Sequence, residues 1–290
     1  MGTRTEIPIP SAAITTLHVE GYPDFMTADS VGVWITNKDK VEKMVWTNAR
    51  PQLTISVPNP CGVMRVAYGS LWVASCDKKS IYRLDHSSGQ LQAIIPTGLA
   101  DPDGELSLAA GDESIWVTSS DAGELSRINI FTNQVSTKIK IAPHSFAATF
   151  GFGSVWVTNT RDATVQRIDP KTNLVIAKIE TGRTPRFLAA GPGGVWVLNQ
   201  DDGTVTQIDP ATHVATTIFT DVKGSGGDIT VGEKYVYVRA KKTLLTLIDP
   251  TSKKIVRRYG PSSGSGAVIV ENGRVWVTAH DIHTIWVLKE

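Results

Sequence analysis

One short pattern recurs seven times along the 290-residue chain: an aromatic residue flanked by β-branched or other apolar residues. Successive aromatic residues are separated by 38, 44, 40, 40, 41 and 39 positions. A period near 40 residues is typical of β-propellers, in which each repeat forms a blade of four strands. Because a blade buries its faces only against neighbouring blades, the repeat predicts one closed seven-bladed ring. The seven aromatic residues are Trp34, Trp72, Trp116, Trp156, Trp196, Tyr237 and Trp276.

An Asp-Pro pair follows the aromatic segment in three copies, at Asp169, Asp209 and Asp249, and a looser Asp-His pair begins at Asp85. A Thr or Ser comes two residues after each of the three prolines. The aspartate side chain can accept backbone N–H bonds, and proline fixes φ at the second turn position. We therefore interpret these carboxylates as parts of turns and not as catalytic groups.

The fifth copy shows how one repeat divides into four strands, at residues 187–190, 195–199, 204–209 and 214–219. Its second strand shows little alternation of apolar and polar residues, which indicates a sheet buried on both faces. A helical period is absent, so we expect almost no helix. The sequence thus predicts an all-β fold in one domain, residues 1–290: a seven-bladed β-propeller of four-stranded antiparallel blades.

The two ends of the sequence predict how the ring closes. The last copy holds strands near residues 267–270, 275–278 and 284–288 and lacks an outer strand. Residues 14–19 form a spare strand ahead of the first copy, and we expect this N-terminal strand to complete the last blade. Such pairing hides two sheet edges at once. Residues 7–10 contain two prolines and should lie outside any central strand.

Composition excludes some classes of partner. Hydrophobic residues make up 41% of the chain and charged residues 20%, which is typical of globular domains. The net charge of +1 gives no argument for nucleic acid or for an anionic membrane surface. Membrane insertion is not expected, since no apolar run reaches the roughly 18 residues that a span needs. We expect a monomeric, extracytoplasmic protein, periplasmic or secreted, whose leader peptide is not part of this sequence.

Residues 155–185 read VWVTNTRDATVQRIDPKTNLVIAKIETGRTP, and this segment resembles the YVTN-type β-propeller repeat family. Members of that family are mostly extracytoplasmic propellers of bacteria and archaea. The blade layout is also similar to that of streptogramin (virginiamycin B) lyases, seven-bladed rings that open a cyclic lactone by metal-assisted elimination. The resemblance covers the whole chain, and it is more specific for fold than for activity because repeat motifs encode packing.

The lyase resemblance implies a His on a loop entering an inner strand, a Glu just after a second strand, and Mg²⁺ between substrate and protein. His144, preceded by a proline, is similar to the first of these, but Asn159 and Thr160 stand where the glutamate would follow. In the seventh copy His280 follows the second strand, while the entering loop 262–266 has no His. The matching positions therefore fall in different blades.

Loops that enter inner strands and loops that leave second strands share one face of a propeller, around the mouth of the central channel. On this face we expect three catalytic candidates, His144, Glu105 and His280, with a divalent metal (Mg²⁺ or Ca²⁺) as a conceivable cofactor. The metal-ligand set itself is left open. The candidates for ligand binding on the same loops are Asp24, Arg65, Asp103, Arg186, Asp228, Lys38 and Lys241.

The exit loops of the sixth, first and second blades carry paired lysines, which would make one side of the rim basic. Such a rim could steer an anionic ligand, or it could simply be a solvated charged surface. Our first functional hypothesis is an exported propeller that binds a small-molecule or peptide-like, possibly anionic, ligand at the central funnel. The alternatives are a metal-assisted lyase or hydrolase and a protein–protein interaction scaffold.

Two cysteines flank the second repeat's first hairpin. Counting outward from the turn at Tyr68 and Gly69 places Cys61 and Cys76 directly opposite each other, within the range of a disulfide. Export would favour that disulfide, because oxidising compartments preserve such bonds. Two free thiols in a cytosolic protein, or a reactive pair at the funnel, are the other interpretations.

Overall fold

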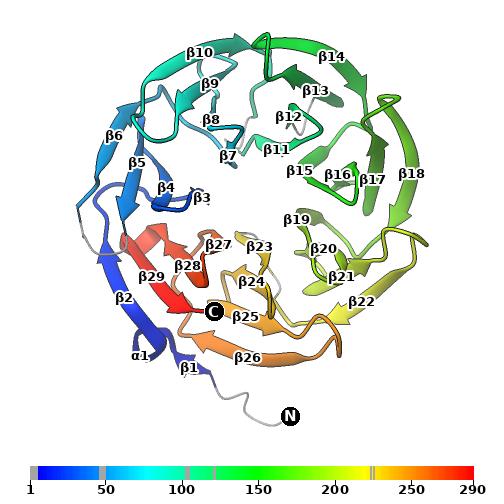
Figure 1. Cartoon of the computed structure of the whole chain (residues 1–290). Helices are drawn as coiled ribbons and strands as arrows, with labels where there is room; N and C mark the ends of the chain where they lie inside the picture. The colour runs from blue at the N-terminus through cyan, green and yellow to red at the C-terminus, as the bar shows by residue number, and fades with distance from the viewer. Residues whose placement is uncertain (1–5, 46–49, 102–104, 120–121, 223, 225) are drawn as a thin grey trace.

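Seven antiparallel sheets stand side by side around a central axis and close into a ring (Figure 1). The computed structural model describes residues 6–45, 50–101, 105–119, 122–222, 224 and 226–290. The strands nearest the axis are β3 (Met26–Ala28), β7 (Arg65–Ala67), β11 (Ser107–Gly111), β15 (Ser145–Gly151), β19 (Pro185–Gly191), β23 (Gly227–Val231) and β27 (Val268–Glu271).

Three further strands follow outward in each sheet. The second strands carry the recurring aromatic residues: β4 (Gly32–Asn37), β8 (Ser70–Ser75), β12 (Ser114–Thr118), β16 (Ser154–Asn159), β20 (Gly194–Asn199), β24 (Val236–Ala240) and β28 (Arg274–Ala279). The third strands are β5 (Lys40–Val45), β9 (Ser80–Asp85), β13 (Glu124–Asn129), β17 (Thr164–Asp169), β21 (Thr204–Ile208), β25 (Leu245–Ile248) and β29 (Thr284–Lys289). The outer strands are β6 (Leu53–Ser56), β10 (Leu91–Pro96), β14 (Gln134–Lys140), β18 (Leu174–Glu180), β22 (Ala215–Phe219), β26 (Ile255–Gly260) and β2 (Ala13–His18).

The predicted closure is confirmed, because β2 pairs antiparallel with β29 and supplies the outer strand of the seventh blade. The proline-rich start also lies outside the central strands. Strand β1 (Ile7–Pro8) pairs parallel with β26 at the outer edge of the sixth blade, and the single-turn helix α1 (Ile9–Ala12) follows. The other helical element in the described residues is a 3₁₀ turn, η1 (His280–Ile282). In that part of the chain no helix is both long and apolar enough to cross a membrane.

A buried aromatic ring and a cation join each of the first four blades to the next blade. Trp156 is 0% exposed, and the Arg167 guanidinium stacks 4.9 Å from the centroid of its ring. The same guanidinium donates a 2.7 Å hydrogen bond to the Pro210 carbonyl in the following blade. Each contact combines apolar burial, a cation–π interaction and a charge-assisted hydrogen bond. The other three cations and their acceptors are Lys43 to His86, Arg83 to Ile130 and Arg127 to Pro170.

This inter-blade aromatic–cation contact changes after the fourth blade. Gln207 stands opposite Trp196, and its amide donates to the Gly193 carbonyl of its own blade. Leu247 stands opposite Tyr237 in the sixth blade, so an apolar side chain takes the position that a cation holds in the first four blades. The contact between aromatic ring, cation and neighbouring carbonyl therefore joins only part of the ring of blades.

The Asp-Pro segments form tight turns between third and outer strands, as the sequence predicts. Asp209 Oδ1 accepts hydrogen bonds from the backbone N–H groups of Ala211 (2.8 Å) and Thr212 (2.9 Å). These backbone bonds lower the pKa of Asp209, because they stabilise the ionised carboxylate. Such carboxylates are engaged in the backbone and lie away from the channel mouth, which agrees with their interpretation as structural groups.

We predict that Arg167→Met lowers the free energy of unfolding by about 2 kcal/mol, because it removes a cation–π contact and leaves a turn carbonyl without its charged donor. The matched control is Gln207→Met, which breaks only a contact within one blade and should cost less than about 1 kcal/mol. Chemical denaturation of both variants measures the difference. Equal losses would show that the contact between blades contributes nothing of its own.

Candidate functional site

A cavity of about 630 Å³ opens at the channel mouth, where loops from five blades meet. We call it the mouth cavity. The loops entering the inner strands of the first, third and fifth blades reach it, together with the loops leaving the second strands of the sixth and seventh blades. Five of the predicted site residues line this cavity together: Asp24, Glu105, Arg186, Lys241 and His280.

Arg186 and Glu105 form an ion pair that joins the fifth blade to the third. Arg186 Nη2 lies 2.5 Å from Glu105 Oε2, and Nε of the same guanidinium lies 3.1 Å from that oxygen. The guanidinium also stacks 3.9 Å from the ring centroid of Phe146 in the fourth blade. Because three blades contribute, these two charges are fixed in place at one side of the mouth cavity.

A second constellation lies on the opposite blades, where Tyr22 stacks on His280. Their ring centroids are 4.1 Å apart, and the Tyr22 hydroxyl lies 3.2 Å from His280 Nε2. The Asp281 carboxylate lies 2.7 Å from Nδ1, although the two atoms are not aligned as a hydrogen bond. Burial lowers the pKa of His280, and Asp281 opposes this effect. The imidazole is thus neutral at neutral pH, and Nε2 can accept a proton.

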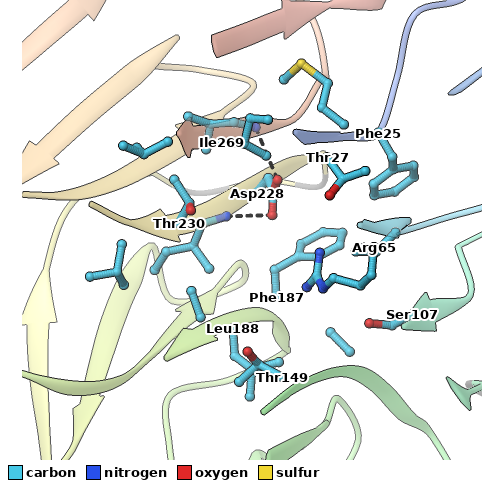
Figure 2. Close-up of a pocket in the computed structure, with 18 of the residues that line it drawn as sticks. Phe25, Thr27, Arg65, Ser107, Thr149, Phe187, Leu188, Asp228, Thr230 and Ile269 are labelled. Carbon is cyan, nitrogen blue, oxygen red and sulfur yellow. Dashed lines mark hydrogen bonds between the residues drawn. The ribbon is translucent and has the colours of Figure 1, made fainter. Parts of the chain in front are cut away.

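Two phenylalanines narrow the channel beneath the mouth cavity. The rings of Phe25 and Phe187 have centroids 6.4 Å apart, and both residues line the mouth cavity and a deeper channel cavity of about 290 Å³. Figure 2 shows Arg65 and Asp228 on the wall of this channel cavity, beside the two rings. Their placement at the mouth was wrong, because both residues belong to inner strands and line the channel below the constriction.

Two carboxyl groups near this constriction have raised pKa values. Burial raises the pKa of Asp24 to about 7, and the negative charges of Glu105, Asp228 and Asp281 add to the effect. Burial also raises the pKa of Asp228 to about 7, although the Val268 and Ile229 N–H groups and Arg65 partly offset it. The site therefore holds more negative charge than it can stabilise near neutral pH.

Arg239 supports the mouth cavity from beneath and is a residue that sequence reasoning missed. It is 0% exposed and donates to three backbone carbonyls, those of Thr278 (3.1 Å), Ala240 (2.6 Å) and Gly264 (3.0 Å). Burial lowers its pKa to about 10, so the guanidinium stays charged near neutral pH. The signal was visible: an Arg follows the Val-Tyr-Val triplet where four other repeats have Thr.

Three other predicted residues lie elsewhere. His144 is exposed on its loop and does not line the mouth cavity. Lys38 lines an adjoining hollow of about 580 Å³ between the first and second blades, which shares Tyr22, Asp24 and Phe25 with the mouth cavity. Asp103 lies outside the described residues.

The two cysteines are joined by a disulfide, with Cα atoms 5.9 Å apart. An isolated bridge between Pro60 and Ser75 shifts the register of the hairpin, so the cysteines are diagonal neighbours and not directly opposite. Cys61 and Cys76 are buried among the apolar residues of the second and third blades. This bond ties the entering loop of the second blade to its exit loop.

The residues of the mouth do not fit the divalent metal that the lyase resemblance implies. Among the described residues, no three His, Cys, Asp or Glu side chains converge as a metal ion would require. Glu105 is instead paired with Arg186.

Sequence reasoning also missed the aromatic part of the site. Tyr22 is a single aromatic residue in a loop, whereas Phe25 and Phe187 share one repeat position, nine residues before Trp34 and Trp196. One available signal was the segment Gly21-Tyr22-Pro23, an aromatic residue within a turn that leads into the first blade. Its stacking partner His280 lies 258 residues away, so only the closed ring brings the two together.

Comparison with known proteins agrees with the architecture. No family model matches the sequence, and no curated protein matches it. Among solved structures, selenomethionine-substituted virginiamycin B lyase from Staphylococcus aureus superposes with a TM-score of 0.79 at 15% identity, covering 95% of this chain and 98% of that chain. A second streptogramin B lyase structure gives a TM-score of 0.78 at 15% identity, covering 96% of each chain. At this identity the likeness shows a shared fold.

We predict that Asp24→Asn makes the fold less sensitive to rising pH. A carboxyl whose folded pKa is raised contributes stability at low pH, and this contribution is lost as the pH rises through about 7. The unfolding free energy of Asp24→Asn relative to the parent should rise by about 1–2 kcal/mol from pH 5 to pH 8. This is less than the full pKa shift would give, because water in the cavity screens part of the interaction.

Thermal melts across this pH range test the prediction, with Asp85→Asn as the control. Backbone hydrogen bonds lower the pKa of Asp85, so its stabilising effect is present above its ordinary pKa and is lost as the pH falls. Between pH 5 and pH 8 the effect of Asp85→Asn should therefore stay constant, whereas that of Asp24→Asn grows with pH. A pH-independent effect of Asp24→Asn would contradict a raised pKa.

Proposed function

We propose that this propeller binds a small ligand in the mouth cavity. The observation that carries the proposal is the convergence of three features around one cavity: a stacked Tyr22–His280 pair, a fixed Arg186–Glu105 pair, and an Asp24 side chain without a hydrogen-bond or ion-pair partner among the described residues. Ligand sites are typically concave, with apolar walls and a few fixed polar groups. The likeness to streptogramin B lyases supports a propeller that acts on a small molecule.

The charges at the mouth favour a ligand with a cation or hydrogen-bond donors. Three carboxylates line the cavity, Asp24, Glu105 and Asp281, against the two cations Arg186 and Lys241. Burial raises the pKa of Asp24, and repulsion by the neighbouring carboxylates adds to this effect. A ligand cation placed among these carboxylates would relieve the repulsion. We therefore propose such a ligand in place of the anionic one that the rim lysines alone predict.

The adjoining hollow indicates room for a longer ligand. It continues from Tyr22 and Phe25 toward Asn59 and Asp77 in the second blade. Asn59 Nδ2 donates to Asp77 Oδ1 at 2.8 Å, which leaves other oxygen atoms of that pair accessible to a ligand. A peptide-like molecule could thus place an aromatic group on Tyr22 and extend across the first two blades.

Two small probes of opposite charge test the ligand class. Tyramine carries an aromatic ring and an ammonium group, whereas 4-hydroxyphenylacetate replaces the ammonium with a carboxylate. We expect tyramine to bind at least about tenfold more tightly, because a charge-assisted hydrogen bond to Asp24 is worth that much. Titration followed by NMR measures both affinities, and Asp24→Asn should remove the difference. Tighter binding of the anion would contradict the proposal.

A second candidate function is elimination with His280 as general base. Its neutral imidazole and the neighbouring Asp281 favour it, and Nε2 lies 3.2 Å from the Tyr22 hydroxyl at the mouth cavity. The base would remove a proton from the carbon next to a carbonyl, a carbon–carbon double bond would form, and the ester C–O bond would break to leave a carboxylate. Tyr22 is 50% exposed, so a substrate can displace its hydroxyl from Nε2.

Incubation with virginiamycin B tests this second candidate. Elimination opens the ring without a change of mass, whereas hydrolysis adds one water, so chromatography coupled to mass spectrometry separates the two outcomes. We expect a product of unchanged mass and a loss of about 10²–10⁴-fold in rate for His280→Ala. His144→Ala is the matched control and should retain the parent rate, because His144 lies outside the mouth cavity. Full activity in His280→Ala would overturn the assignment.

We further propose an extracytoplasmic location. The Cys61–Cys76 disulfide supports it, since such bonds persist in oxidising compartments. Titration of free thiols on denatured, unreduced protein isolated from its native host should find none, and two should appear after reduction. Two thiols before reduction would contradict this proposal.

A further inference from the structure

The junction between the sixth and seventh blades differs from the other junctions of the ring. In the first four blades a cation opposite the aromatic residue reaches the turn between the third and outer strands of the next blade. In the seventh blade these strands are β29 and β2, which come from opposite ends of the sequence and have no such turn (Figure 1). The sixth blade has Leu247 in place of the cation and Tyr237 in place of Trp.

The missing contact leaves a cavity of about 250 Å³, which we call the closure cavity. Leu245, Leu247 and Leu288 form an apolar wall, and three tyrosines line the rest. The rings of Tyr235 and Tyr237 lie edge to face, with centroids 6.2 Å apart. A slot bounded by aromatic rings and leucines suits a planar apolar group.

The closure cavity also holds a hydrogen-bond donor without a partner. Tyr237 is only 2% exposed as a residue, and its hydroxyl makes no hydrogen bond to another described residue. Burial raises the pKa of this hydroxyl, and the nearby Glu290 adds to the effect, so it remains protonated as a donor. Because Tyr237 lines the cavity and its hydroxyl oxygen is not fully buried, a ligand acceptor in the cavity can reach it.

Cations surround the opening of this cavity. Lys234, Arg257 and Lys289 line it, and Arg257 Nη1 donates to the Tyr259 hydroxyl at 3.1 Å. The one lining acidic side chain, Glu290, accepts from the Lys234 backbone N–H at 3.2 Å, and the main-chain oxygen of Glu290 accepts from Lys234 Nζ at 3.4 Å. Arg257 and Lys289 add two further positive charges, which favour an anion at this opening.

We propose that the closure cavity binds a small aromatic carboxylate. The ring of the ligand would lie between the tyrosines and the leucine wall, and its carboxylate would accept from the Tyr237 hydroxyl and from Arg257. This site is separate from the mouth cavity, with which it shares no lining residue. It does not depend on the function proposed for the mouth.

Benzoate titration, followed by calorimetry or NMR, tests this site in the full chain. Tyr237→Phe keeps the ring and removes the donor, and it should weaken benzoate binding about tenfold. Arg257→Gln should weaken it by at least about the same factor, because a charge-assisted hydrogen bond is lost. Unchanged affinity in both variants, or no binding to the parent at millimolar benzoate, would overturn the proposal.

A double variant whose larger side chains fill the closure cavity provides a further test of where benzoate binds. Tyr237→Trp with Leu247→Arg restores the residue pair that the second, third and fourth blades carry. It should abolish benzoate binding, and a melting curve shows whether the variant is folded. Binding that survives in the folded double variant would place benzoate elsewhere and overturn the assignment. The single variant Tyr237→Phe keeps the test valid if the double variant does not fold.

Discussion

The burial of one aromatic ring between each pair of neighbouring blades is the interaction on which this structure depends. Six tryptophans and Tyr237 occupy equivalent second strands, and all are nearly or completely buried. A single blade would expose these rings to water, so the free energy of burial is gained only when the next blade is present. Cations add hydrogen bonds to carbonyls of the neighbouring blade in the first half of the ring. The fold is consequently cooperative around its circumference and needs both ends of the chain to meet.

Ring closure also explains why the mouth cavity exists. Five blades contribute residues to its lining, and no single blade supplies them all. Arg186 and Glu105 lie 81 residues apart in sequence and Tyr22 and His280 lie 258 apart, yet each pair is in contact. Rigid sheets hold these loops, so carboxylates are kept close together although they repel one another. Burial and this repulsion together raise the pKa of Asp24. A site that is strained in this way is suited to a ligand that neutralises it.

Closure by strands from the two ends has a second consequence at the junction of the last two blades. The second to fifth blades each have a turn that accepts a hydrogen bond from the cation of the preceding blade, whereas the seventh blade has no such turn. At this junction the sixth blade has Tyr237 and Leu247 in place of the Trp and Arg that face each other in the second, third and fourth blades. The pairing of β2 with β29, which completes the ring, thus also leaves the closure cavity at this junction, away from the mouth cavity.

The sequence by itself determined the number of blades, the strand order within each blade, the closing strand and the role of the Asp-Pro turns. These features depend on local period, turn chemistry and the need to bury apolar faces, all of which can be read along the chain. Only the tertiary structure decided which loop residues face one another. Arg65 and Asp228 follow loops equivalent to the one that holds Asp24 but lie below the Phe25–Phe187 constriction, and His144 does not line the mouth cavity. The direction of a side chain at the mouth depends on the tilt of each blade and on contacts with blades far away in sequence, and no local pattern encodes either.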